Sequence, residues 1–361
     1  MEYRTLPHGG EQISVLGLGM GYISGTEDEM TAIIDRAIDG GINFFDMAAS
    51  ERAPYAAYAR AFSGRRNKVL TQLHFGAVYD GGKYGWTRDL AHIRRTFEWE
   101  LGLFEYADFG FIHCTDDMAD ANLILQGGIW DYMKQQKADG RIRHLGFSSH
   151  NPQVARQILD TGLIDLFMFS INPAYDYQQG SYGIGEVAER AALYRDCERM
   201  GVGISVMKPF GGGQLLEAGL SPFRRALTKN QCIQYALDRP AVLTVLPGVR
   251  TMEDLEQVLA YAQASPEERD YSAIGDFTPQ EAYGNCVYCN HCQPCPAGLN
   301  VGLINKYYDL AKAGDAMAAG HYEKLDLHAG DCMQCGHCES RCPFRVAQVS
   351  RMGEICEYFG Q

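Results

Sequence analysis

The hexapeptide Ile42-Asn43-Phe44-Phe45-Asp46-Met47 is mostly apolar and carries a carboxylate near its far end. Comparable short runs recur along the chain at Val15–Gly19, Val69–His74, Phe109–Cys114, His144–Ser149, Leu166–Ile171, Gly203–Met207 and Leu243–Pro247. Such near-continuous apolar runs suit strands that are buried on both faces of a parallel sheet. The segments between them are amphipathic, most clearly at Glu29–Asp39, Asp89–Leu101, Ile129–Ala138 and Glu186–Met200. Eight strand–helix units predict an α/β fold, a (β/α)8 TIM barrel, over residues 1–275.

An open doubly wound sheet is the main alternative to the barrel. That fold usually has fewer strands and places a Gly-rich phosphate-binding turn after its first strand. The segment Gly17-Leu18-Gly19-Met20-Gly21 faintly resembles such a turn. A lone glycine pattern is weak evidence, however, so the number of strand–helix units favours the barrel.

Two runs of cysteines dominate the C-terminal segment. Each has three cysteines spaced two residues apart and a fourth just before a proline: Cys286, Cys289, Cys292 and Cys295, then Cys332, Cys335, Cys338 and Cys342. In the two-cluster ferredoxin pattern, the fourth cysteine of each run binds the other cluster. We therefore expect two [4Fe–4S] clusters. One would be held by Cys286, Cys289, Cys292 and Cys342, and the other by Cys332, Cys335, Cys338 and Cys295.

Structural zinc and disulfides are the competing interpretations of these cysteines. Zinc sites usually pair two CxxC units, and disulfides suit secreted chains. We expect a linker at residues 266–283 and a cluster domain over residues 276–361. The helix-like stretch Leu303–Leu325 between the two cysteine runs is too long for a compact β-rich ferredoxin. A small, mainly helical ferredoxin-like domain is the better prediction.

The composition of the 361 residues is ordinary for a globular protein, with 46% hydrophobic and 21% charged residues. The net charge of −13 argues against nucleic acid as a partner. No secretion signal is visible, and no apolar run is long enough to span a bilayer. Cysteines in cluster motifs require a reducing compartment. We expect a cytoplasmic protein whose partners are a small-molecule substrate and a redox protein, not a membrane.

In a barrel of this kind, the chemistry is carried by residues at the C-terminal ends of the strands. Those ends hold Asp46, His74, His113, Ser148–His150, Asn172, Lys208 and Arg250. Here the chain resembles the aldo-keto reductases, in particular the branch with an appended iron–sulfur domain. The resemblance is carried by residues 41–46, 112–113, 140–150, 207–213 and 247–251, together with the cysteine runs behind them.

The resemblance implies reduction of carbonyls with NADPH by an Asp, Tyr, Lys and His tetrad. Asp46 and His113 match the Asp and the His of that set, but Glu51 stands at the Tyr position and His74 at the Lys position. A carboxylate beside His74 would favour the imidazolium. We expect His74 or His113 to donate a proton, with Glu51 as orienting partner or base, or as the acid itself if an apolar pocket raises its pKa.

Two other interpretations of these four residues stay open. Two imidazoles and a carboxylate match the facial triad of non-haem iron. Alternatively the site is degenerate, with Glu51 turned to solvent and His74 a buried core histidine. Cys114 adjoins His113 and is the one cysteine outside the two runs for which we expect more than apolar packing.

The resemblance also implies a site for NADP(H), in which Arg250 would bind the 2′-phosphate. Ser149 and Asn172 match positions near the nicotinamide amide, and Lys208 and the glycines Gly211 and Gly212 lie where the pyrophosphate would run. The Glu-Asn pair that commonly holds the adenine is Gln257-Val258 in this chain.

Three functions follow from these features. The first is an oxidoreductase of the aldo-keto reductase type that carries two [4Fe–4S] clusters and acts on a carbonyl, an alcohol or an activated double bond. The second is a non-redox lyase or isomerase in which Glu51, His74 and His113 move protons and the clusters are structural. The third is an electron carrier built on an inactive barrel.

Overall fold

The computed structural model describes residues 1–49, 51–78, 85–177, 182–223, 225–274, 284, 286, 292–312, 318–342 and 344–361. Its centre is an eight-stranded sheet of β3 (Gly17–Gly19), β4 (Phe44–Met47), β5 (Leu70–Phe75), β8 (Ala107–Ile112), β9 (Ile142–Ser149), β10 (Leu166–Ser170), β11 (Gly203–Met207) and β12 (Val242–Val245). Neighbouring strands are parallel and follow one another in chain order. A bridge between Leu16 and Val245 brings the two edges together. The predicted (β/α)8 barrel is confirmed, and the open doubly wound sheet is set aside.

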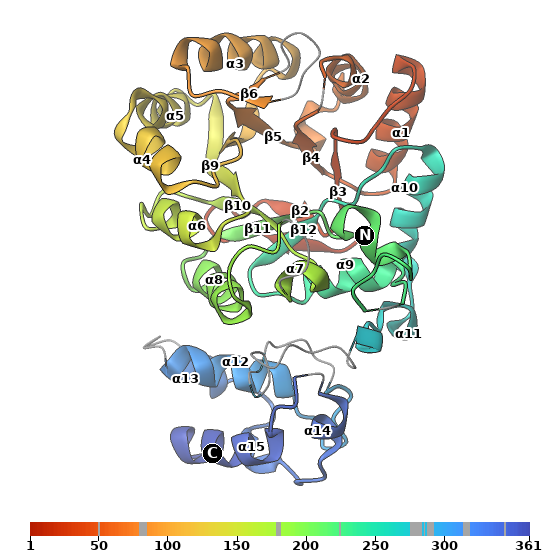
Figure 1. Cartoon of the computed structure of the whole chain (residues 1–361), viewed down its shortest axis with the longest axis vertical. Helices are drawn as coiled ribbons and strands as arrows, with labels where there is room; N and C mark the ends of the chain where they lie inside the picture. Colours follow the sequence, from red (N-terminus) through yellow and green to blue (C-terminus); the bar gives the residue numbers. More distant parts are fainter. Residues whose placement is uncertain are drawn as a thin grey trace.

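Helices surround the barrel (Figure 1). They are α1 (Glu27–Asp39), α2 (Ala53–Phe62), α3 (Leu90–Phe104), α4 (Met118–Gln126), α5 (Gly128–Ala138), α6 (Pro152–Leu159), α8 (Val187–Arg199), α9 (Lys229–Leu237) and α10 (Met252–Leu259). The short elements are η1 (Arg66–Lys68), β6 (Ala77–Val78), β7 (Gly85–Trp86), α7 (Pro173–Asp176), η3 (Gly211–Leu216), η4 (Ala260–Gln263), α11 (Pro266–Arg269) and η5 (Ser272–Ile274). Helix α1 begins at a capping box between Thr26 and Glu29, which satisfies free backbone N–H groups.

The barrel interior is divided into an apolar part and a polar part. A hairpin of β1 (Tyr3–Thr5) and β2 (Gln12–Ser14) contributes to the apolar cluster inside the barrel, which consists of Leu6, Ile13, Phe44, Phe109, Phe111, Leu166, Met168, Leu243 and Leu246. Gly146 in β9 makes room for this packing, because a Cβ there would lie 2.2 Å from the Phe111 ring and 2.5 Å from the Leu166 backbone oxygen. The buried polar side chains Gln72 and His74 come from β5, and Ser205 comes from β11.

All regular elements that the structure describes after residue 284 are helices. They are α12 (Val301–Lys312), α13 (Ala318–Tyr322), η7 (Ala329–Asp331), α14 (His337–Arg341) and α15 (Gln348–Phe359). These helices share an apolar cluster of their own, which includes Ile304, Tyr322 and Ile355. Most of the predicted linker lies outside the described residues. Its first part, residues 266–274, forms α11 and η5, and Tyr271 and Ile274 are buried against the barrel.

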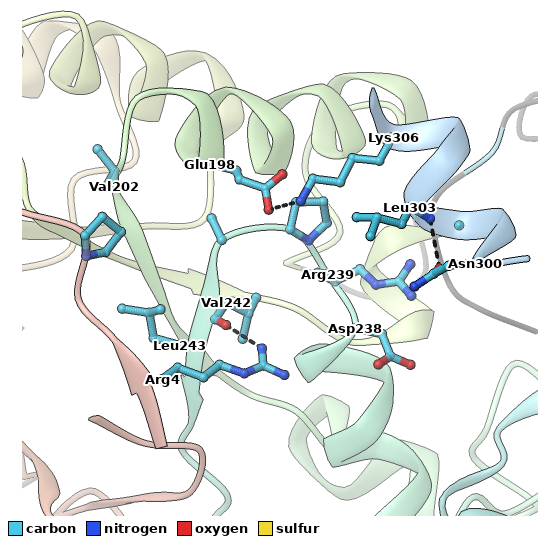
Figure 2. A pocket seen from close by; sticks show the side chains of 14 residues that line it. Arg4, Glu198, Val202, Asp238, Arg239, Val242, Leu243, Asn300, Leu303 and Lys306 are labelled. Carbon is cyan, nitrogen blue, oxygen red and sulfur yellow. Dashed lines mark hydrogen bonds and ion pairs between the residues drawn. The ribbon is translucent and has the colours of Figure 1, made fainter. Parts of the chain in front are cut away.

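The C-terminal helices lie beside α7 and α8 of the barrel (Figure 1). Lys306 of α12 pairs with Glu198 of α8 at 2.6 Å, and the Phe344 ring lies 5.9 Å from that of Tyr177. A cavity of about 360 Å³ lies at this junction. Figure 2 shows the side chains that line it. Its charged groups already have protein partners: for example, Arg4 donates to the Val242 backbone oxygen. The cavity is therefore a junction between the two parts of the chain and not the candidate reaction site.

None of the helices in the described part of the chain has the length and apolar character needed to cross a membrane.

Candidate functional site

Three of the four predicted catalytic residues form a hydrogen-bonded row at the barrel mouth. Asp46 lies in β4, His74 in β5, and His113 directly follows β8. The Nε2 atom of His74 is 2.7 Å from Oδ1 of Asp46, and the Nδ1 atoms of His74 and His113 are 2.9 Å apart. Neighbouring parallel strands bring these residues together, since Asp46 pairs with Gln72 and His74 pairs with Phe111.

The polar contacts around the row determine where its protons lie. Nε2 of Gln72 donates to Oδ1 of Asp46 at 2.8 Å, and the Ser205 hydroxyl donates to Gln72. If Asp46 is ionised, His74 carries its proton on Nε2 and accepts from His113 through Nδ1. Burial, with His74 next to it, holds the pKa of His113 well below its usual range. In that arrangement the row runs from a neutral His113 through His74 to the Asp46 carboxyl group.

Glu51 does not share this buried environment. It lies exposed in the loop between β4 and α2. Its sequence position matches the missing Tyr, but the structure places its side chain at the surface, so its catalytic role stays a prediction.

A second polar group lies at the ends of β8, β9 and β11. Nδ1 of His150 is 2.9 Å from Oδ2 of Asp116, and Nε2 of His150 is 2.7 Å from Nζ of Lys208. The Lys208 ammonium also lies 3.1 Å above the centre of the Tyr182 ring. Cys114 completes the group, with Sγ 3.6 Å from Oδ2 of Asp116.

The protonation of this group follows from burial and pairing. Burial lowers the pKa of Lys208 to about 8. Burial alone would raise the pKa of Asp116, but the hydrogen bonds from His150 and Ser149 and the charge interaction with His150 together outweigh burial and bring the value to about 2. Burial and the neighbouring Asp116 raise the pKa of the Cys114 thiol to about 11. At neutral pH the group therefore holds a carboxylate, an ammonium and a thiol.

Sequence reasoning did not include Asp116 or His150 among the site residues. His150 was visible at the end of a predicted strand, but its partners come from two other strands. The sequence feature that could have identified the Asp116 carboxylate is its position three residues after His113, just beyond the same predicted strand.

The residues expected near NADP(H) divide into two sets. Ser149 and Asn172 are fully buried and already bonded: Ser149 donates to Asp116, and Asn172 donates to the Lys208 backbone oxygen. Gly211 and Gly212 have positive φ values of 59° and 67°. Gly211 is buried against Leu215 and Asn172, whereas Gly212 has open space beside it. Arg250 is exposed beyond β12. On the phosphate side Gly212 and Arg250 are thus accessible, Gly211 is buried and Lys208 is bonded to His150, while the amide-side residues are occupied by protein contacts.

The cysteines of the two runs that the structure describes lie in three surroundings. Cys295, Cys332, Cys335 and Cys338 all line one small cavity, and they are the four residues predicted to share a cluster. Cys286 and Cys342 pack against the barrel's apolar core, and Cys292 is buried in the C-terminal core. Cys289 lies outside the described residues. The backbone N–H of Gln334 also points at the Cys332 sulfur, 3.4 Å away.

Comparison with known proteins gives a consistent result. The family model described as "Aldo/keto reductase family" matches residues 15–231. The uncharacterized oxidoreductase YqkF of Bacillus subtilis is 24% identical over 311 residues, which cover 78% of this chain and 98% of that protein.

Solved structures agree on the fold. The aldo-keto reductase AKR11C1 from Bacillus halodurans, in its holo form, has a TM-score of 0.62 at 20% identity, over 77% of this chain and 97% of its own. PA4992 from Pseudomonas aeruginosa has a TM-score of 0.58 at 21% identity, over 72% of this chain and 93% of its own.

Proposed function

Because the chain belongs to the aldo/keto reductase family, we propose that it is an iron–sulfur oxidoreductase of that family with an altered proton-transfer set. Its substrate would be a small carbonyl, alcohol or activated double bond, and its cofactors NADP(H) and two [4Fe–4S] clusters. The observation that carries the proposal is the hydrogen-bonded row of Asp46, His74 and His113 at the barrel mouth.

In this proposal His113 exchanges a proton with the substrate through Nε2, the ring nitrogen not engaged with His74. When Nε2 of His113 takes a proton from the substrate, the Nδ1 proton of His113 passes to Nδ1 of His74, which becomes the imidazolium while His113 stays neutral. The reverse transfers return the proton to the substrate. The Asp46 carboxylate, 2.7 Å away, stabilises that positive charge. Gln72 and Ser205 keep Asp46 and His74 in place through their own hydrogen bonds. The row thereby replaces the Tyr–Lys pair that this chain lacks.

NADP(H), when bound, would supply or accept the hydride. Arg250 is suited to a 2′-phosphate because its guanidinium is exposed and permanently charged. The open space beside Gly212 allows close approach of a pyrophosphate. Ser149 and Asn172 would bind the nicotinamide amide after releasing their present partners, Asp116 and the Lys208 backbone oxygen.

Two clusters, when bound, would supply single-electron transfer between a redox partner and the barrel. The four cysteines that line the small cavity, Cys295, Cys332, Cys335 and Cys338, are the four residues of one predicted cluster. Cys286 and Cys342, expected in the other set, pack together with the barrel core that also contains Phe344 and Tyr177. This second cluster would therefore be the one nearer the barrel.

The test uses full-length protein purified without oxygen. We expect about eight iron and eight sulfide ions per chain, and NADPH oxidation on adding small carbonyls. Replacement of Cys335 by Ser should lower the iron content, whereas Cys356→Ser, the matched control outside both runs, should not. His113→Asn should abolish turnover and retain iron, whereas His8→Asn at the opposite end of the barrel should change neither. Absence of iron from the wild type would refute the cluster assignment. Activity of His113→Asn equal to that of the wild type would refute the proton-transfer role of His113.

The row of Asp46, His74 and His113 also supports a lyase or isomerase, because it moves protons and needs no electron acceptor. That second function predicts turnover that survives complete removal of the clusters and of NADPH. Turnover that stops on either removal favours the oxidoreductase.

A further inference from the structure

We propose that Cys114, Asp116 and His150 form a binding site for a zinc-like divalent cation at the barrel mouth. The three side chains each offer one ligand atom, and these atoms all lie within 4.8 Å of one another. The inference does not depend on the proposed reaction, and the site is separate from the cysteine-rich C-terminal segment.

The spacing of the three groups suits a tetrahedral cation. Zinc binds sulfur at about 2.3 Å and nitrogen or oxygen at about 2.0–2.1 Å, which puts neighbouring ligand atoms about 3.3–3.7 Å apart. Sγ of Cys114 is 3.6 Å from Oδ2 of Asp116, and Nδ1 of His150 is 2.9 Å from the same oxygen. The second pair must open by a few tenths of an ångström to admit the ion, and the third pair, Cys114 and His150, lies within 4.8 Å.

The ligands are already held by surrounding groups. Oδ1 of Asp116 accepts the backbone N–H of His150 at 2.6 Å and the hydroxyl of Ser149 at 3.2 Å. The backbone N–H of Cys114 donates to the hydroxyl of Ser148 at 2.8 Å. Such outer contacts orient metal ligands and are part of a working site. They fix the loop after β8 to the end of β9, so Asp116 keeps Oδ2 directed toward Cys114 and His150.

The chemistry of the donors selects the cation. A thiolate, an imidazole and a carboxylate together suit zinc or a similar transition metal, whereas calcium and magnesium prefer oxygen alone. The thiolate and the carboxylate would neutralise the two positive charges. Three protein ligands leave one position for water or a substrate oxygen, as in catalytic zinc sites. Because Cys114 follows His113 directly, that position would lie beside the candidate catalytic row.

Lys208 is the built-in competitor for this site. Its ammonium is 2.7 Å from Nε2 of His150 and supplies positive charge near Asp116. A cation bound by Nδ1 of His150 would face repulsion from that ammonium. Removing the charge with Lys208→Met should therefore strengthen metal binding, the opposite of what the loss of a ligand would do.

The experiment is zinc binding to the full chain with its clusters loaded under anaerobic conditions. After gel filtration we expect one tightly held zinc per chain by elemental analysis, with one sulfur and the rest nitrogen or oxygen in its X-ray absorption spectrum. Cys114→Ser and Asp116→Asn should each weaken binding at least 100-fold, Cys356→Ser should leave it unchanged, and Lys208→Met should tighten it.

Several results would overturn the site. They are no retained zinc in the wild type, zinc surrounded by three or four sulfurs, and equal retention by Cys114→Ser. The spectrum of the wild type decides the question without any variant, so a ligand variant that fails to fold cannot hide the answer.

Discussion

The buried carboxyl of Glu100 supports the strand that carries Asp46. Glu100 lies in α3 and is 1% exposed, and its Oε1 is 3.1 Å from the hydroxyl of Tyr55. The same hydroxyl donates to the backbone oxygen of Met47, the residue after Asp46, at 2.9 Å. Burial raises the pKa of Glu100 to about 8, against an ordinary value of 4.5. At neutral pH the carboxyl is therefore mostly protonated.

Replacing Glu100 by Gln removes the titration and keeps the shape and a hydrogen-bond donor. Because the folded-state pKa lies above the unfolded value, the wild type loses stability as the pH rises from 4.5 to about 8, and the loss is complete above that. At about 1.4 kcal/mol for each pH unit, the full loss is about 5 kcal/mol. Gln does not titrate. The free energy of unfolding of Glu100→Gln should therefore rise relative to that of the wild type across this pH window, by up to about 5 kcal/mol.

The assay is chemical unfolding followed by far-UV circular dichroism at pH 5 and pH 8.5, without oxygen. Glu98→Gln on the same helix is the control: the hydrogen bond from Arg141 lowers the pKa of Glu98, so its replacement should cost stability at high pH, within about 1 kcal/mol. A difference between Glu100→Gln and wild type that is the same at both pH values would refute the reasoning. So would lower stability of Glu100→Gln at pH 8.5.

Three further outcomes are expected. Gly146→Ala should lower the free energy of unfolding by about 1–3 kcal/mol, since its Cβ would meet the Phe111 ring and the Leu166 backbone. Gly320→Ala, the control with open space around the glycine, should not lower it. Equal denaturant midpoints for Gly146→Ala and the wild type would contradict this. Phe344→Ala should loosen the C-terminal segment from the barrel by removing its ring from Tyr177, and limited proteolysis that is as slow as in the wild type would speak against that contact. Asp46→Asn should lower kcat about 100-fold or more while the Kd for NADPH is unchanged, because it removes the carboxylate that stabilises an imidazolium at His74; unchanged kcat would exclude the row from the reaction.

The barrel was predictable because its signal is local. Each strand is a short apolar run, and the eight runs recur at strand–helix spacing, so Gly203–Met207 and Leu166–Ile171 were placed almost to the residue. Helix ends were less predictable. The amphipathic segment expected at Asp89–Leu101 ends just before Gly102, but α3 continues to Phe104, because Leu101 and Phe104 bury their side chains in the core. Tertiary packing outweighs the tendency of glycine to end a helix.

The candidate site was predictable only where the strands themselves bring residues together. Asp46, His74 and His113 occupy the ends of three consecutive barrel strands, so their meeting follows from the fold. Asp116 and Lys208 meet through His150, and this contact joins the ends of β8, β9 and β11. A loop conformation after β8 decides that contact, and no periodicity in the sequence encodes it.

In the proposed function, the two polar groups at the mouth divide between them the role of the lysine that the family resemblance predicts on the third strand. At that position stands His74, whose Nε2 atom is hydrogen-bonded to Asp46. The ammonium comes instead from Lys208 on the seventh barrel strand, with Asp116 and His150 as its partners. His113 lies between the two groups. Its pKa is lowered mainly by burial and to a smaller extent by His74, Arg88 and His150. A neutral His113 flanked by a relay on one side and a cation on the other can accept a proton only transiently. This is the property that reversible proton exchange with a bound substrate requires.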